Sequence, residues 1–201
     1  MMHGHAEALL PMIDEAIRSV ALPLSALDLI AVTVGPGSFT GIRIGLAAAR
    51  GIALAADLPL FGISSFEATA ALPAVARARC VVLVALESRR ADIYVQLIDP
   101  AGGLLREPAA VPPERLPAII ATAIGGRPLA IAGDAAAGAR ASLGDRPDVI
   151  VADDASPLAI GVALAAVKLW RQGRRSSSTR PFYLRPPDVT VAGRPLSRGG
   201  S

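Results

Sequence analysis

Two patterns of apolar residues follow one another at the start of the chain. Between residues 6 and 20 the apolar positions recur every three or four residues, as on one face of a helix. These positions are Leu9, Leu10, Ile13, Ala16, Ile17 and Val20. Residues 28–34 are instead a short run rich in β-branched side chains that stops at Gly35-Pro36-Gly37. The pattern predicts an amphipathic helix and then a buried strand that ends in a tight loop.

A second helix and a second strand are expected after this loop. Ser38 or Thr40 can cap a helix that reaches about Ala56, and an apolar run over residues 60–63 follows it. Strand, glycine loop, helix and strand together predict a βαβ unit.

A short helix and a linker then separate this unit from the rest of the chain. Ser64 or Ser65 can cap the helix, and Glu67 stands where the acid of a capping box would lie. A linker that contains Pro73 is expected next.

The second half of the chain predicts a hairpin followed by alternating helices and strands. The expected strands are residues 80–86, 91–98, 129–132 and 149–152, with a short extra strand at Leu104-Leu105. The expected helices are residues 114–123 and 135–143 and a last helix that opens at Ser156-Pro157 and ends near Trp170. This pattern resembles an enlarged copy of the first unit. We therefore expect two similar α/β lobes, residues 1–72 and 73–175, followed by a basic tail rich in Pro, Ser and Arg over residues 176–201.

Composition limits the protein class. Of the 201 residues 52% are hydrophobic and 18% are charged, which predicts a folded, globular chain. No uninterrupted apolar run approaches the roughly 18 residues that a membrane span needs. Residues 1–5 do not resemble a secretory signal, so a cytoplasmic location without membrane contact is expected.

Charge is unevenly distributed along the chain. The formal net charge is +3, and the residues from Lys168 onward contain eight basic side chains and one acid. Such a tail is either a solvated segment or a contact for RNA or an acidic partner. The single cysteine, Cys80, lies beside the apolar run 81–84 and is expected to be a core thiol rather than a nucleophile.

The most specific motif is the segment 35–45, GPGSFTGIRIG. It lacks the lysine of a P-loop, and its glycine spacing does not match a dinucleotide-binding loop. Two interpretations remain: a loop that holds an anion at a helix N-terminus, or a tight turn between a strand and a helix. The residues that define this motif loop are Gly35, Gly37, Ser38, Thr40, Gly41 and Arg43.

The helix after the motif carries small residues at every fourth position. Gly41, Gly45, Ala49 and Ala53 would form a stripe that allows another helix to approach closely. The partner would be either the helix of residues 6–20 or a helix of another subunit.

Together, several segments resemble the TsaB (YeaZ) family. They are residues 5–13 (HAEALLPMI), the motif at 35–43, Gly62-Ile63-Ser64-Ser65 and the segment 181–188 (PFYLRPPD). The resemblance implies an actin-like ATPase fold (ASKHA, RNase H-like) with two related lobes. Family members start with a strand and a hairpin that have no counterpart before Met1, so the first lobe is expected to be truncated.

The resemblance also implies a function in tRNA modification. A TsaB protein is a non-catalytic scaffold, a pseudo-enzyme that binds and activates TsaD. TsaD transfers the threonylcarbamoyl group to the adenosine beside the anticodon, and TsaE supplies an ATPase cycle in a ternary complex. The resemblance thus implies a heterodimer with TsaD, a homodimer of the free protein, and tRNA contact only through the complex.

By the same resemblance we expect no catalytic residue, metal or cofactor in this chain. The expected partner interface consists of Leu9, Leu10, Ile13, Gly41, Gly45, Ala49 and Ala53. The residues that would contact tRNA are Arg174, Arg175, Arg180 and Arg185.

Three other functions compete with this hypothesis. An ASKHA-type phosphotransferase would need acids on both lobes, and the second hairpin offers Glu87 and Asp92. A glycopeptidase-like metalloenzyme would need paired histidines, and the chain has His3 and His5. A stand-alone RNA-binding module would use Trp170, Phe182 and Tyr183 for base stacking.

Overall fold

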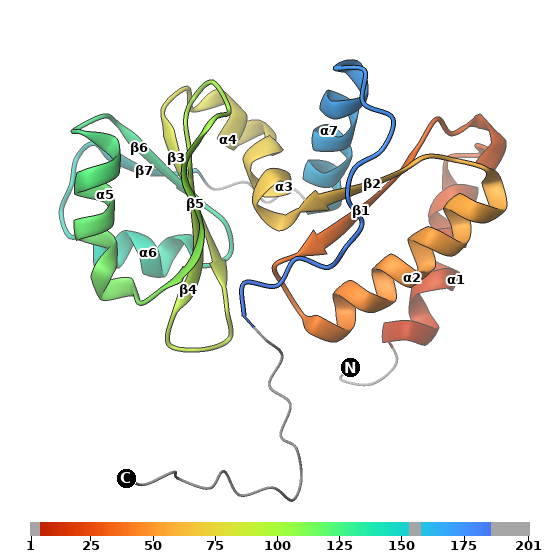
Figure 1. The fold of residues 1–201 in the computed structure, drawn as a ribbon, viewed down its shortest axis with the longest axis horizontal. Helices are drawn as coiled ribbons and strands as arrows, with labels where there is room; N and C mark the ends of the chain where they lie inside the picture. Colours follow the sequence, from red (N-terminus) through yellow and green to blue (C-terminus); the bar gives the residue numbers. More distant parts are fainter. Residues whose placement is uncertain (1–4, 153–157, 186–201) are drawn as a thin grey trace, which may run out of the picture.

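Two β-sheets form separate lobes in the computed structural model, which describes residues 5–152 and 158–185 (Figure 1). The first sheet has two parallel strands, β1 (Ile30–Gly35) and β2 (Leu60–Ser64), and helix α2 (Phe39–Ala56) connects them. The second sheet has five strands in the order β5-β4-β3-β6-β7. The α/β fold with two related lobes is thus confirmed.

The second sheet combines a hairpin with a βαβ unit. Its antiparallel strands are β3 (Val81–Glu87), β4 (Ile93–Ile98) and β5 (Leu104–Val111). Its other strands, β6 (Leu129–Ala132) and β7 (Val149–Val151), run parallel to β3 and are joined by α6 (Ala136–Ser142). The β6-α6-β7 unit repeats the plan of β1-α2-β2, which is the relationship expected between the two lobes.

Helices cover both sheets (Figure 1). Their bounds are α1 (His5–Ser19), α3 (Ser65–Ala71), α4 (Pro73–Arg77), α5 (Leu116–Ile124) and α7 (Leu158–Arg171), with short 3-10 turns η1 (Leu24–Ala26) and η2 (Pro113–Arg115). α5 and α6 lie on one face of the second sheet, and α3 and α4 lie on the other. α1 packs on α2, and α7 crosses α3 between the lobes.

Local signals explain where two of the helices begin. The Ser38 hydroxyl accepts a hydrogen bond from the Gly41 amide at 3.3 Å and caps α2. At α3 the predicted capping box is complete, because Ser64 and Glu67 each bond to the backbone amide of the other.

Some expectations need correction. The linker expected at Pro73 is the short helix α4, which begins at this proline because the first helical turn needs no amide donor there. The third strand is longer than Leu104-Leu105: β5 extends to Val111 because β4 offers it a ladder along its length. Ser156 and Pro157, expected to open the last helix, lie outside the described residues.

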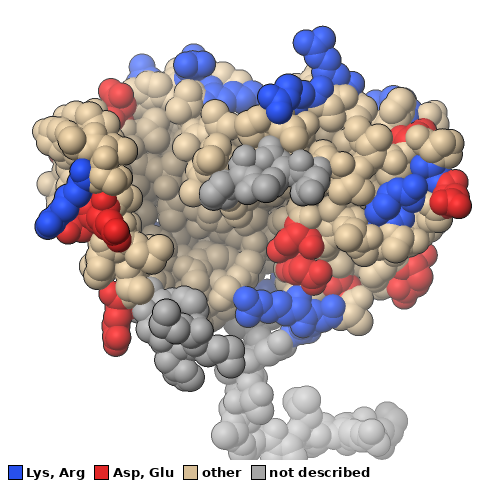
Figure 2. Space-filling model, turned by 180° about the vertical axis from the view of Figure 1, so that it is seen from behind, with Lys and Arg blue, Asp and Glu red and all other residues tan. Residues whose placement is uncertain are grey.

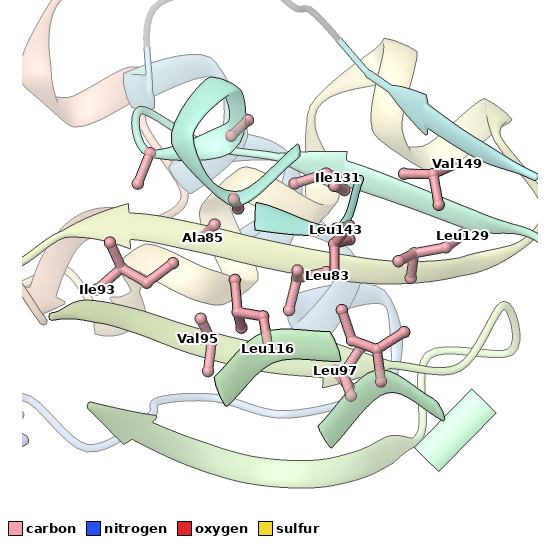
Figure 3. Close-up of a cluster of buried hydrophobic side chains, with 14 of the residues drawn as sticks. Leu83, Ala85, Ile93, Val95, Leu97, Leu116, Leu129, Ile131, Leu143 and Val149 are labelled. Carbon is pink, nitrogen blue, oxygen red and sulfur yellow. The ribbon is translucent and has the colours of Figure 1, made fainter. Parts of the chain in front are cut away.

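The largest core lies between the second sheet and helices α5 and α6 (Figure 3). Leu83 and Ala85 point into this core, whereas Val82 and Val84 belong to the core on the opposite face, with Phe66 of α3. This alternation follows the period of two along a strand, and it explains why β3 is apolar on both sides.

Two features join the lobes. At the crossing of α3 and α7, a Cβ atom on Gly161 would overlap the carbonyl oxygen of Ala68, so the two backbones are in direct contact. Residues 176–185, which we call the strap, return from α7 across the first sheet (Figure 1). The Ser177 hydroxyl donates to the Gly62 carbonyl at 2.7 Å, and the Phe182 amide donates to the Val34 carbonyl at 2.7 Å. This part of the predicted tail is therefore packed against the first lobe.

Candidate functional site

The motif loop is a structural turn that the strap covers. Gly35 has φ of +114°, and a Cβ atom there would clash with the carbonyl oxygen of Phe182, so glycine is required. The Pro36 carbonyl accepts a hydrogen bond from the buried Ser65 hydroxyl at 2.8 Å. Of the two interpretations of this motif, these contacts favour the tight turn.

Arg43 of the motif is engaged by aromatic side chains. Its guanidinium lies 3.8 Å from the ring centroid of Phe39, and its Nε donates to the Tyr183 hydroxyl at 3.3 Å. The rings of Phe39 and Tyr183 are 5.2 Å apart. The motif thus anchors the strap, a role that the spacing of its glycines did not reveal.

A polar cleft of about 450 Å³ separates the two lobes. It is lined by the motif loop, the β3–β4 loop, Asp134 and the end of the strap. The Asp134 carboxylate accepts a hydrogen bond from the Glu87 amide at 2.8 Å. Asp92, beside the cleft, is buried and pairs with Arg185 of the strap, while Ser88 donates to the Asp92 carboxylate at 2.7 Å.

These acids have structural partners, which limits the chemistry of the cleft. Within residues 5–152 and 158–185, no three His, Cys, Asp or Glu side chains gather as they would around a metal ion.

Cys80 is partly buried against the core beneath α4, and this burial raises the pKa of its thiol. It is therefore protonated near neutral pH, in agreement with the expected core role.

The second hollow is an apolar groove of about 610 Å³ between α1 and α2, which we call the α1–α2 groove. Its lining is almost entirely aliphatic: Leu9, Leu10, Leu24, Ile44, Ala47, Ala48, Gly51, Ile52 and Ala55. Leu10 is 57% exposed. An aliphatic groove of this kind on a protein surface is typical of a docking site for another protein.

α2 uses opposite faces for its own sheet and for this groove. Its buried residues are Ile42, Leu46, Ala49 and Ala53, which face the first sheet. By length and composition alone α2 could cross a membrane, but one face of it packs on β1 and β2.

This arrangement corrects part of the predicted interface. Ala49 and Ala53 are buried inside the chain, and a Cβ atom on Gly45 would meet Val32 of β1 at 3.8 Å. The small-residue stripe therefore serves the packing of α2 on its own sheet. Gly41 is exposed at the first turn of α2, beside Ser38.

Three residues of the predicted interface lie on α1. Leu9 and Leu10 line the groove, and Ile13, one turn later, is half-buried. Sequence reasoning missed the groove residues of α2. The aliphatic positions 44, 48, 52 and 55 are a helical stripe that the glycine and alanine pattern concealed.

The four arginines considered for tRNA contact do not form one cluster. Arg174 and Arg175 are exposed just after α7, and Arg180 is exposed on the strap. Arg185 is held in the cleft region by Asp92.

The aromatic side chains proposed for base stacking are engaged within the chain. Trp170 packs edge-on against Phe61, with ring centroids 6.2 Å apart, and Arg175 covers its ring. Phe182 packs into two of the cores, and Tyr183 contacts Phe39. These contacts argue against a stand-alone module that stacks RNA bases on them.

Comparison with known proteins places these features in a family. The family model described as "TsaD: tRNA N6-adenosine threonylcarbamoyltransferase" matches residues 1–116. The "tRNA threonylcarbamoyladenosine biosynthesis protein TsaB" of Haemophilus influenzae is 39% identical over 90 residues, 45% of this chain and 38% of that protein. Its Escherichia coli namesake is 34% identical over 90 residues, 45% of this chain and 39% of that protein.

The matched segment thus spans less than half the length of these curated relatives. A solved structure, YeaZ from Pseudomonas aeruginosa, superposes with a TM-score of 0.72 at 27% identity and covers 90% of this chain and 84% of that one. The chain therefore belongs to the TsaD family and, within it, to the TsaB (YeaZ) group.

Proposed function

We propose that this chain is the non-catalytic scaffold subunit that binds and activates TsaD in threonylcarbamoyladenosine biosynthesis on tRNA. The observation that carries the proposal is the open α1–α2 groove. The names of the relatives supply the pathway, and the groove supplies a surface for a protein partner.

The groove suits a partner built like this chain. The TsaD family model matches residues 1–116, a range that includes α1 and α2. A TsaD subunit therefore contains a helix pair related to this one. Two related helix pairs can pack face to face in a pseudo-symmetric bundle, and burying the exposed 57% of Leu10 would contribute about 1–2 kcal/mol.

The contacts in the cleft support a non-catalytic role. An ASKHA-type phosphotransferase or a glycopeptidase-like enzyme, the alternative function, needs carboxylates free to hold a metal or move a proton. Here Asp92 holds Arg185, and Asp134 holds the backbone of Glu87. Asp92 thus ties the strap to the second lobe, and Asp134 holds the end of β3, so catalysis is assigned to TsaD.

The remaining partners follow from this role. TsaE joins the TsaD-bound chain as the ATPase of a ternary complex in the cytoplasm. Without TsaD, the exposed groove favours association of two copies of the chain, because each copy then covers the groove of the other.

Size-exclusion chromatography with light scattering tests the proposal. The chain, alone and mixed with TsaD from the same organism, is compared with Leu10→Asp in the groove and Leu104→Asp on β5. Both leucines are more than half exposed, so neither change should unfold the protein, but only Leu10 lines the groove. We expect the parent and Leu104→Asp to co-elute with TsaD and Leu10→Asp to lose at least tenfold in affinity.

Two results would contradict the proposal. If the folded chain does not pair with TsaD, the scaffold function fails. If Leu10→Asp pairs as well as Leu104→Asp does, the groove is not the interface. Hydrolysis of ATP by the purified chain, lost in Asp134→Asn, would favour the phosphotransferase alternative instead.

A further inference from the structure

Basic side chains gather along one edge of the molecule. They come from two segments far apart in the sequence, the end of α4 with the loop after it and the end of α7 with the residues that follow. Figure 2 shows lysine and arginine side chains spread along its upper edge. We call this surface the basic edge; its members are Arg77, Arg79, Lys168, Arg171, Arg174 and Arg175.

The sheet register explains how the two segments meet. Val82 pairs with Ile98 in the β3–β4 ladder, so Arg79 lies at the same end of the sheet as the turn of residues 99–103. A Cβ atom on Gly102 of this turn would lie 3.5 Å from the Lys168 ammonium. The turn therefore connects the α4 segment with the last turns of α7.

The positive charge of the basic edge is not neutralised within the chain. All six side chains are exposed, and in the described parts of the chain none of them pairs with a carboxylate. Two acids at this end of the sheet, Asp99 and Asp148, have other partners. Asp99 pairs with Arg127 at 3.1 Å, and Asp148 pairs with Arg146 at 2.5 Å.

The chemistry of the basic edge fits phosphate groups. Five of its six members are arginines, whose planar guanidinium binds phosphate through two parallel hydrogen bonds. A row of such groups fits a polyanion with regularly spaced phosphates better than a single small anion. Since aromatic side chains nearby are engaged, contacts to the backbone rather than to bases are expected.

We propose that the basic edge binds the phosphate backbone of tRNA; this inference rests on the proposed function. The basic edge shares no residue with the α1–α2 groove, so a partner in the groove leaves these six side chains uncovered by its contacts there. It also differs from the set of arginines predicted by sequence, because it omits Arg180 and Arg185 and adds residues of α4 and α7.

Fluorescence anisotropy with a labelled, unmodified tRNA transcript tests this inference at several salt concentrations. The full chain is measured alone and mixed with TsaD. The variants are Arg171→Glu/Arg174→Glu and, on the other segment, Arg77→Glu/Arg79→Glu. The control Arg89→Glu/Arg115→Glu makes the same change of net charge at the opposite end of the second sheet.

We expect each variant of the basic edge to weaken tRNA binding at least tenfold, with little change in the control. The slope of log Kd against log salt concentration should also fall by about 2, because two phosphate contacts are lost. Equal losses in the variants and the control would show that only net charge matters and would overturn the inference. So would unchanged affinity in the variants, or binding of phosphatidylglycerol vesicles without binding of tRNA.

Co-elution with TsaD is measured on the same samples, which separates the two proposals. If the chain pairs with TsaD but the charge reversals leave the tRNA affinity of the complex unchanged, the basic edge fails and the scaffold function stands. If the chain alone binds tRNA through the basic edge but ignores TsaD, the scaffold function fails and the basic edge stands.

Discussion

Arg185 of the strap pairs with Asp92, a buried carboxylate directly before β4. The same strap is hydrogen-bonded to Val34 and Gly62 in the first lobe. The ion pair therefore closes a connection from one sheet to the other. Because Asp92 is 5% exposed, it depends on the strap for its charge partner.

Removing this partner should destabilise the protein. We expect Arg185→Ala to lower the free energy of unfolding by about 1–3 kcal/mol, since the Asp92 carboxylate stays buried, hydrogen-bonded to Ser88, without the cation that pairs with it. Arg185 itself is partly exposed, so solvent screens the pair and the loss stays below that of a fully buried ion pair. Arg180→Ala, an exposed change in the same strap, is the control. Equal urea midpoints for the two variants would show that the pair contributes nothing.

Two helical glycines should respond in opposite ways to substitution by alanine. Gly161 lies at the crossing of α3 and α7, and Gly138 lies on the open surface of α6. Gly161→Ala places a methyl group against the Ala68 carbonyl and should destabilise by about 1–3 kcal/mol. Gly138→Ala in α6 meets open space and should stabilise by about 0.5–1 kcal/mol, because alanine is the better helix former. Thermal unfolding of both variants tests the crossing; a tolerated Gly161→Ala would argue against it.

Two neighbouring alanines of α2 distinguish its inner and outer faces. Ala49→Leu enlarges a buried side chain against the first sheet and should cost about 1–3 kcal/mol of stability. Ala48→Leu adds the same atoms in the α1–α2 groove and should change stability by less than about 0.5 kcal/mol. Urea unfolding measures both. A larger loss for Ala48→Leu would reverse our assignment of the two faces.

Cys80 should react slowly with thiol reagents. Its burial raises the pKa of the thiol, so at pH 8 a smaller fraction is thiolate than in free cysteine. The rate of alkylation by iodoacetamide should rise with pH around a midpoint above that of free cysteine and should increase when the protein is unfolded in urea. A midpoint at or below the free value would mean an activated thiol.

Much of the fold was predictable because its signals are local. The β-branched run before Gly35 and the Ser64–Glu67 capping box depend on residues close in sequence, and both were confirmed. The length of β5 was not predictable from Leu104-Leu105, since its later residues form a strand through pairing with β4.

The candidate site was predictable only in part. Leu9 and Leu10, on the apolar face of the predicted amphipathic helix, do line the groove, while their contact with a partner stays a prediction. α2 is apolar on two faces, so the spacing of its apolar residues does not show which face packs on the sheet. The stripe containing Ala49 was therefore assigned to a partner although it is buried within the chain.

Residues close together in the chain were enough to predict most helices and strands, the βαβ unit and the family resemblance, because period, capping and motif spacing are local; helix α4 was the exception. Three features became visible only in the folded chain: which face of α2 remains open, how the strap brings Arg185 to Asp92, and how Arg79 and Lys168 reach the same edge. Each of these contacts joins residues far apart in the chain. Their pairing depends on how whole elements pack, and no local pattern encodes it.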